Sequence, residues 1–280
     1  MRATILVHVA VAAGYSLNRA VPQTNGVPGF ACIPVPMDRL VAPGQRATMH
    51  VYDASSLQVL RHAQAHANST YGQVVLDEAA MRERKFEVMA VGSRLKIVSL
   101  QPSTHQDKFG GSSQSLIAEV IGVGIIEPGQ LFQKMPFMTV DCKGEDRLLT
   151  SDEGCAIALE ALEETALLCQ SLDSVASFKG PLTPQTESES GREWSIAECV
   201  SSVLEYRGYD KPTDAIMCAP VSALAATVHL PGEVRYEAMR LAQQAGTSAD
   251  ELVQYVQKAL EEESRRRLAV KALADLGSGP

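Results

Sequence analysis

The sequence predicts an α+β fold, in which a β-rich front half closes into a small barrel or sandwich and an all-helical half follows. Between residues 31 and 149, short runs rich in Val, Ile and Leu alternate with turn residues. From residue 150 to 277, apolar side chains instead recur at helical spacing. Over 280 residues, 45% apolar and 21% charged residues are typical of a globular protein with one large core or two ordinary ones.

The front half contains five strand candidates and one helix candidate. A Pro-Gly turn at Pro43-Gly44 precedes the first of these strands, and a polar, glycine-bearing loop over 103–114 joins two others. Apolar spacing over 55–67 predicts one inserted helix with Ser55 or Ser56 as its N-cap. The predicted strands are ATMHVY (47–52), YGQVVL (71–76), FEVMAVGSRLKIVSL (86–100), SLIAEVIGVGIIE (115–127) and PFMTVDC (136–142).

The rear half contains five helix candidates, and a Pro/Thr/Ser/Glu-rich stretch over 179–191 predicts an exposed linker. Ser248 and Glu251 form a capping-box pattern, so the last helix is predicted to start there and to run to near Gly277. Glu261–Glu263 precede Arg265–Arg267 by four residues each, which indicates a self-supporting, solvated helix face. The predicted helices lie within 154–178, 192–206, 219–230, 231–246 and 247–277.

The first 30 residues have the composition of a targeting leader. Arg2 precedes an apolar run over 3–13, and neither Asp nor Glu occurs before Asp38. The leader predicts an organellar protein, with a plastid transit peptide favoured and a mitochondrial or secretory leader as alternatives. An N-terminal β-strand would explain the same apolar residues. Because this run is too short to span a bilayer and no later stretch could do so, stable membrane insertion is not expected.

Charge and cysteine spacing limit the classes of function. A net charge of −8 and an aromatic fraction of 5% disfavour nucleic acid as a partner, since such binding needs Lys, Arg and stacking side chains. The six cysteines lack the paired spacing of a zinc site, so no cofactor or metal is expected, and the thiols are predicted to be reduced and mostly buried. The glycines Gly122 and Gly124 are interpreted as residues at a strand bend rather than as a nucleotide loop.

Histidines supply the candidate for catalytic or metal chemistry. His62 and His66 stand at i and i+4 on the predicted helix, a spacing at which two imidazoles can bind one metal ion. Ala63 replaces the Glu of the zincin motif, and a helical wheel turns both histidines away from the apolar side. A polar helix face is therefore the simpler interpretation. The alternative function is a small hydrolase or metal-dependent enzyme that uses His62, His66 or His50 with a distant acid.

The order of short motifs resembles the start of the Lon protease N-terminal domain family. Ile33-Pro34-Val35-Pro36, Pro43-Gly44 and His50-Val51-Tyr52-Asp53 match the family's Pro-containing strand, its turn and the strand that leads into its helix. The rear half is similar to the helical part that follows in that family, especially over 219–263. The later front-half stretches that match in family order are 71–76, 91–101, 115–128 and 136–141.

This resemblance implies a PUA-like small β-barrel with an inserted helix, followed by a C-terminal helical bundle. Together with the composition, it divides the chain into a leader over 1–30, a barrel over 31–149 and a helical domain over 150–277. The chain stops at Pro280 without an ATPase or peptidase module, so it is expected to be a stand-alone member of the family.

The family role that the resemblance implies is recognition of polypeptide without turnover. We therefore expect a non-enzymatic protein- or peptide-binding module, an adaptor or assembly subunit, with a polypeptide or protein complex as its partner. RNA binding remains an alternative, because PUA-like barrels can bind RNA. The candidate polypeptide-binding surface consists of Met37, Leu40, Met49 and Tyr52.

Overall fold

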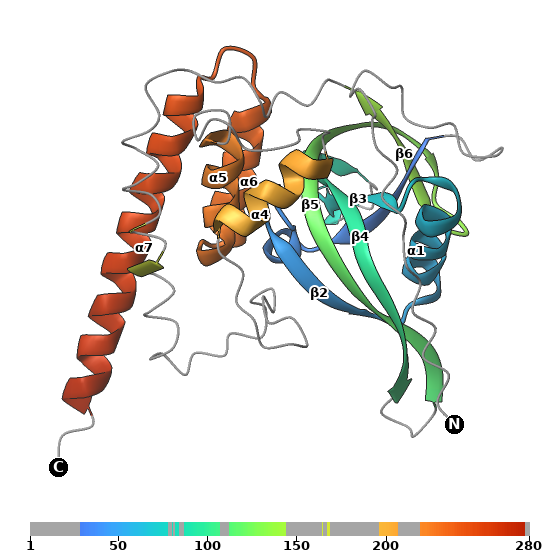
Figure 1. The fold of residues 1–280 in the computed structure, drawn as a ribbon, viewed down its shortest axis with the longest axis horizontal. Coiled ribbons are helices and arrows are strands. Elements are labelled where there is room, and N and C mark those ends of the chain that lie inside the picture. The colour runs from blue at the N-terminus through green and yellow to red at the C-terminus, as the bar shows by residue number, and fades with distance from the viewer. Residues whose placement is uncertain are drawn as a thin grey trace.

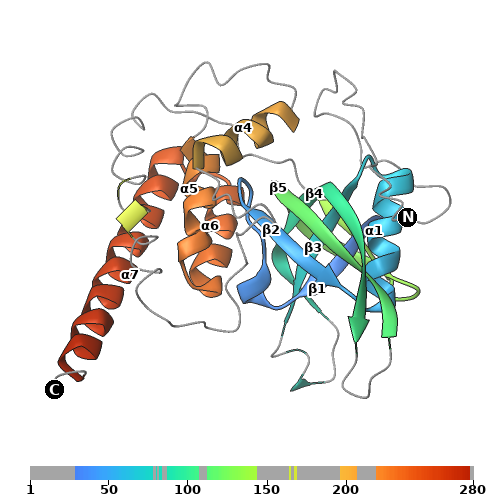
Figure 2. The same cartoon turned by 60° about the horizontal axis from the view of Figure 1, so that its bottom comes forward.

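The computed structural model describes residues 29–77, 80, 82–83, 87–106, 112–143, 164, 167–168, 196–206 and 219–277. The predicted leader up to residue 28, the predicted linker over 179–191 and nearly all of the predicted helix over 154–178 lie outside the described residues. Figures 1 and 2 show the strands gathered on one side of the molecule and the helices of the rear half on the other. No helix in the described part of the chain is long and apolar enough to cross a bilayer.

Six strands form one mixed sheet, which confirms the α+β class. They are β1 (Phe30–Val35), β2 (Arg46–Val51), β3 (Thr70–Leu76), β4 (Val88–Gln106), β5 (Ser112–Gln133) and β6 (Met138–Lys143). Their order is β2-β5-β4-β3-β1-β6, and β6 pairs with β5 as well as with β1. The pairings therefore run in a ring through β5, β4, β3, β1 and β6, with β2 added to the first half of β5.

The predicted strands are present, but two of them are longer than their patterns indicate. The strand β4 continues to Gln106 and the strand β5 begins at Ser112. Most of the predicted loop over 103–114 is therefore strand. Alternating polar residues such as Ser103 and His105 pair with Ser115 and Ser113 across the hairpin. A polar strand was mistaken for a loop because neither of its faces carries the apolar repeat of a buried strand.

Helix α1 (Ala54–His66) lies against the sheet on the side away from the other helices (Figure 1). Its N-cap is Asp53, not Ser55 or Ser56, because the Asp53 carboxylate accepts a hydrogen bond of 2.8 Å from the Ser56 amide. Its buried side chains pack into the sheet with the inward residues of β2 and β5. This core contains Val51, Leu57, Leu60, Ala63, Tyr71, Leu95, Ala118 and Val120.

The helices of the rear half pack on one another and on the opposite side of β5. They are α4 (Ile196–Tyr206), α5 (Ala219–Ala226), α6 (Gly232–Gln243) and α7 (Ala249–Gly277), with short 3-10 turns at Met37–Arg39 (η1) and Thr227–His229 (η3). Ile121, Val123 and Ile125 of β5 enter the same core as Leu224, Met239 and Leu260 of the helices. One continuous core thus joins the sheet to the helices.

The segment 37–45 forms the junction between sheet and helices. Gly44 adopts a φ of +78° in the predicted Pro-Gly turn, and a Cβ there would lie 2.9 Å from the Cβ of Ala225. Gly122 of β5 meets the same segment, since a Cβ there would lie only 2.1 Å from the carbonyl oxygen of Ala42. The glycine at this position therefore permits a close backbone approach inside a strand.

Buried polar side chains hold the junction together. The Gln45 side chain accepts from the Ala42 amide at 3.0 Å and donates to the Leu224 carbonyl at 3.1 Å. Arg235 of α6 is buried, and each of its five N–H groups reaches a backbone carbonyl oxygen. These carbonyls belong to Asp38, Leu40, Thr227, Val228 and Leu230. Burial lowers the pKa of Arg235 to about 10, which leaves the guanidinium protonated at neutral pH.

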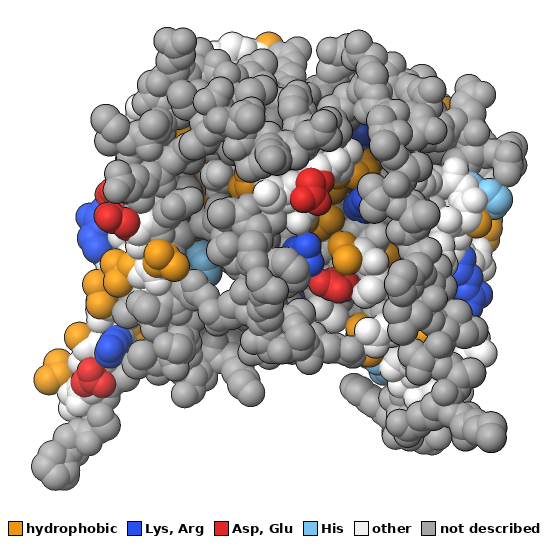
Figure 3. All heavy atoms as spheres, in the orientation of Figure 1, with side chains coloured by type: hydrophobic (Ala, Val, Ile, Leu, Met, Phe, Trp, Pro, Cys, Tyr) orange, Lys and Arg blue, Asp and Glu red, His pale blue; other side chains and the backbone are white. Residues whose placement is uncertain are grey.

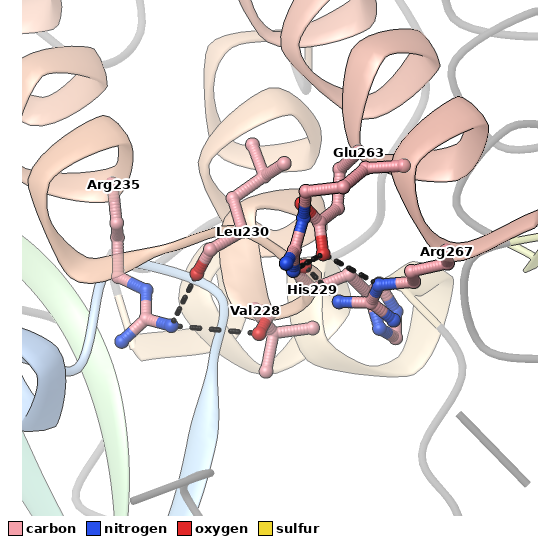
Figure 4. A network of polar contacts seen from close by, with 7 residues as sticks. Val228, His229, Leu230, Arg235, Glu263 and Arg267 are labelled. Atoms are coloured by element: carbon pink, nitrogen blue, oxygen red, sulfur yellow. Dashed lines mark hydrogen bonds and ion pairs between the residues drawn. The ribbon is translucent and has the colours of Figure 1, made fainter. Parts of the chain in front are cut away.

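Helix α7 starts on the predicted capping box, since the Ser248 hydroxyl accepts from the Glu251 amide at 3.1 Å and the Glu251 carboxylate accepts from the Ser248 amide. The predicted face of paired charges is only partly solvated, because Glu263 is buried. Its carboxylate accepts from both Arg266 and Arg267, and Arg267 also donates to the His229 carbonyl. Figure 4 shows this network and that of Arg235 meeting at η3.

Candidate functional site

The strands β2, β5 and β4 share a face that the helices cover only in part. Ile121 lies under the helices, whereas Glu119, Ile117 and Ser115, on the same side of β5, lie progressively farther from them. We call the uncovered part the outer face. The register places on it Thr48 and His50 of β2, Glu119, Ile117 and Ser115 of β5, and Ser99, Gln101, Ser103 and His105 of β4, with Tyr52 directly after β2.

Three rings gather at the far end of this face, and we call them the aromatic cluster. The rings of Tyr52 and His105 stack with centroids 4.2 Å apart and planes 11° apart. His50 stands edge-on to both, with centroids 6.1 Å from Tyr52 and 5.9 Å from His105. A ring nitrogen of His50 lies 2.7 Å from the Ser115 hydroxyl oxygen, which fixes the imidazole. Tyr52 is nevertheless 54% exposed, so part of this side chain is in contact with solvent.

The other end of the outer face is anchored to α4 by charged side chains. Arg46 and Glu119 form an ion pair at 3.3 Å, and Arg46 also donates to the Ser202 hydroxyl of α4. The Ser99 hydroxyl donates to the second oxygen of Glu119. Charges of both signs, with apolar side chains between them, lie over β4 and β5 in Figure 3. The outer face therefore presents no field of a single sign.

The four residues predicted to form a polypeptide-binding surface do not form one patch. Tyr52 belongs to the aromatic cluster, and the partly buried Met49 lies on the opposite side of β2, where its sulfur accepts from Gln73 at 3.5 Å. Met37 packs at the edge of the core between sheet and helices. The prediction is wrong for Leu40, which is fully buried in that core and cannot line a surface. An apolar residue beside a turn was read as exposed, whereas the junction covers it.

The histidine pair on α1 is close but partly covered. The ring centroids of His62 and His66 are 5.2 Å apart, and His62 packs 5.1 Å from the ring of Phe137. Burial, and then the neighbouring His66, lower the pKa of His62. Contrary to the helical wheel, His62 is therefore half-buried rather than turned fully to solvent. Among the described residues, no three His, Cys, Asp or Glu side chains lie close enough to hold a metal ion together.

Cys32 and Cys142 are free thiols. Cys32 is buried in β1, and burial, followed by the nearby Cys142, raises its pKa well above that of an ordinary thiol. Burial likewise raises the pKa of Cys142 to about 12, against the opposing effect of the Arg94 guanidinium. Both thiols are therefore protonated at neutral pH and weakly nucleophilic. Cys32 thus fits the prediction of a buried thiol that acts as a small hydrophobe, whereas Cys142 is only partly buried.

Sequence reasoning did not find His105 or Ser115 as site residues. Both stood in or beside a segment that was predicted to be a loop, and neither has a partner nearby in sequence. No local signal marks them, because residues 101–105, Gln-Pro-Ser-Thr-His, carry no apolar alternation. Only the pairing of β4, β5 and β2 brings His105 onto Tyr52, which is 53 positions earlier in the chain.

Two solved structures are similar to this chain at low identity. The N-terminal domain of Mycobacterium avium complex Lon protease is 12% identical, and the match covers 84% of this chain and 97% of that chain with a TM-score of 0.43. The Lon N-terminal domain protein from Xanthomonas campestris is 13% identical, and the match covers 64% of this chain and 99% of that chain with a TM-score of 0.34. These structural neighbours are domains of the family that the motif order resembles. No family model and no curated protein matches the sequence.

Proposed function

We propose that the chain is a non-enzymatic module that binds polypeptide segments and acts as an adaptor or assembly subunit. The observation that best supports this function is the aromatic cluster on the outer face. A Tyr ring supplies a large contact area at a small cost in side-chain entropy, and Tyr is enriched where proteins bind one another. Stacking on His105 and the contact of His50 with Ser115 hold the rings in place before a partner arrives.

The scaffold suits this role because the cluster lies on paired strands rather than on a free loop. We infer that the ring of pairings through β5, β4, β3, β1 and β6 is a small PUA-like barrel, and that the rear helices form a bundle beside it. A closed ring resists bending, and the core shared with the helices braces the near end of β5. The far end then presents its side chains in a constant geometry.

The charge of the protein supports a polypeptide over a nucleic acid. The net charge is −8, and Arg46 and Glu119, two charged side chains of the outer face, are paired with each other. A phosphate backbone would find little to neutralise it there. Neutral or basic polypeptide segments do not need positive side chains on the protein, and the overall negative potential favours the approach of basic segments.

The experiment that tests this function measures binding of a permanently unfolded protein. Fluorescein-labelled, reduced and carboxymethylated α-lactalbumin is titrated with the full chain, and fluorescence anisotropy reports the Kd. We expect Tyr52→Ala to raise the Kd about tenfold, because it removes the most exposed ring of the cluster. The matched control is Met135→Ala: Met135 is 77% exposed but lies between β5 and β6, so its loss should leave the Kd unchanged.

Three outcomes would contradict the proposal. The first is no binding of the unfolded protein at any accessible concentration. The second is an equal Kd for Tyr52→Ala and the unaltered chain. The third is tighter binding of a single-stranded RNA probe at low salt than of the unfolded protein, which would favour the RNA-binding alternative.

A further inference from the structure

Arg94 of β4 is a half-buried cation whose N–H groups are not all used within the chain. Its Nε–H is buried and has no hydrogen-bond partner. Among the residues that the structure describes, no carboxylate forms an ion pair with it. Arg235 differs, since each of its N–H groups reaches a carbonyl oxygen. A buried donor without a partner is costly, so Arg94 retains the capacity to bind an acceptor oxygen.

Arg94 points towards a core made of strand residues, which we call the strand core. Its cross-strand partner on β3 is Gly72, where a Cβ would meet the Cys32 sulfur and the Phe30 ring. Directly paired residues point to the same face of a sheet, so Arg94 lies on this face too. Its guanidinium carbon is 5.6 Å from the centroid of the Phe30 ring. The strand core consists of Phe30, Cys32, Val74, Ile126, Met138 and Val140, with Leu76, Val88, Leu131 and Cys142 partly buried beside them.

The residues of the strand core do not neutralise the charge of Arg94. Burial raises the pKa of Cys142 to about 12, against the opposing effect of Arg94, so this thiol is uncharged at neutral pH. Burial also raises the pKa of Cys32. The Phe30 ring attracts the cation but carries no net charge. Because a guanidinium in apolar surroundings is stabilised by a counter-ion, an anion that reaches Arg94 gains a favourable partner.

The strand register indicates how an anion can reach the guanidinium. Both residues paired with Arg94 are glycines, Gly72 on β3 and Gly124 on β5. Neither has a side chain that could lie against the guanidinium. Arg94 itself is partly exposed, so its side chain is in contact with solvent as well as with the strand core. A small group can therefore approach Arg94 from solvent.

From these observations we propose that Arg94 binds a monoanionic carboxylate. The Nε–H and one Nη–H of a guanidinium form a fork that matches the two oxygens of a carboxylate, and the Nε–H of Arg94 has no other partner. One guanidinium neutralises one negative charge. The second charge of a phosphate would stay uncompensated, and Asp141 lies close enough to act on the neighbouring Cys142 thiol.

The source of the carboxylate connects this site to the function proposed above. That part of the inference rests on polypeptide binding, because the C-terminus of a bound polypeptide ends in a monoanionic carboxylate. A small free carboxylic acid has the same chemistry. The two experiments below distinguish these sources.

Nuclear magnetic resonance tests the site directly in the ¹⁵N-labelled full chain. Sodium chloride is replaced stepwise by sodium acetate at constant ionic strength, and the Nε–H signal of Arg94 is identified by its loss in Arg94→Lys. We expect a saturable downfield shift of this signal, because a charge-assisted hydrogen bond forms. The Nε–H of Arg235 is the internal control, since it already donates to the Thr227 carbonyl and should not move. An Arg94 signal that acetate leaves unchanged would overturn the proposal.

A pair of peptides tests whether a polypeptide supplies the carboxylate. Both are N-terminally fluorescein-labelled ten-residue chains of Ala and Val with a C-terminal Leu, one ending in the free acid and the other in the amide. We expect the acid to bind about tenfold more tightly and Arg94→Met to remove this preference. The matched control is Lys96→Met, two residues along β4, where the ammonium lies over the Tyr206 ring and the preference should remain. A preference that persists in Arg94→Met would place the carboxylate elsewhere and overturn the proposal.

These outcomes separate the carboxylate site from the polypeptide-binding function. If unfolded α-lactalbumin binds and Tyr52→Ala weakens it, but acetate does not shift Arg94 and the two peptides bind equally, the site fails and the function stands. If acetate shifts Arg94 but no polypeptide probe binds, the site stands for small carboxylic acids and the function fails. Thermal unfolding checks that each variant is folded. If Arg94→Met does not fold, the acetate titration of the unaltered chain decides.

Discussion

The junction and the outer face both carry polar side chains, but those of the junction are mainly buried and those of the outer face are mainly exposed or partly exposed. At the junction, Gln45 and Arg235 are buried, and every Arg235 donor has a carbonyl partner. On the outer face, His50 and Tyr52 are exposed and contact mainly other rings. At the junction, the polar side-chain groups of Gln45 and Arg235 already form hydrogen bonds within the chain. The outer face keeps exposed ring surface on Tyr52.

This difference separates residues that hold the fold from residues that can bind a partner. A substitution at the junction should unfold the protein, because it leaves buried polar groups without partners. A substitution in the aromatic cluster should leave stability nearly unchanged and alter binding, as the Tyr52→Ala experiment tests. Three further variants test this difference, in order of decreasing effect on stability.

The variant Arg235→Met should cause the largest loss of stability. It removes all five hydrogen bonds and leaves buried carbonyl oxygens unsatisfied, at an expected cost of about 3–5 kcal/mol in the free energy of unfolding. Urea denaturation followed by circular dichroism measures this loss. The matched control is Arg240→Met on the same helix, where only an exposed ion pair with Glu237 is lost and the midpoint of urea denaturation should barely change. Similar losses in the two variants would remove the distinction between junction and surface.

The variant Gly122→Ala should be the next most damaging. Its Cβ would overlap the Ala42 carbonyl oxygen, so the segment 42–45 must move away from β5, at a cost of about 2–3 kcal/mol. Thermal unfolding measures the shift in Tm. The control, Gly246→Ala, has open space around it and a φ of +90°, so it should lose only about 1 kcal/mol from backbone strain. If Gly122→Ala unfolds no earlier than Gly246→Ala, the close approach does not constrain the junction.

The third prediction concerns the pH dependence of stability at His62, which is neither fully buried nor fully exposed. Because its pKa is lowered in the folded state, the unfolded chain binds the proton more tightly. His62 therefore opposes folding increasingly as the pH falls below about 7 towards 5, and the effect disappears above that range. In His62→Gln, Tm should fall less steeply between those pH values than in the unaltered chain. A steeper fall in the variant would contradict the lowered pKa.

The elements that could be predicted from the sequence are those with a buried face. Apolar alternation located β2 and β3 to within a residue or two, and the capping box at Ser248 and Glu251 marked the start of α7. The predictions failed where several neighbouring residues could cap the same helix or where no face of a strand was buried. Asp53 caps α1 although two serines stood nearby, and the polar ends of β4 and β5 looked like a loop.

The candidate site was only partly predictable, because its contacts join distant parts of the chain. Tyr52 was identified beside its strand, but its stacking partner His105 lies on β4 and is reached across β5. The two histidines that the sequence placed together, His62 and His66, are neighbours because a helix brings i and i+4 onto one face. His50 and His105 are almost as close, yet no local rule relates them.

Local patterns in the sequence specify the strands and helices that have a buried face, because apolar periodicity and capping act over a few residues. The composition also sets the negative charge of the chain. It takes the folded chain to bring Arg235 to five carbonyls and to gather three rings on the outer face. Those features depend on strand order and on the packing of helices far apart in the chain, which no short pattern of residues specifies.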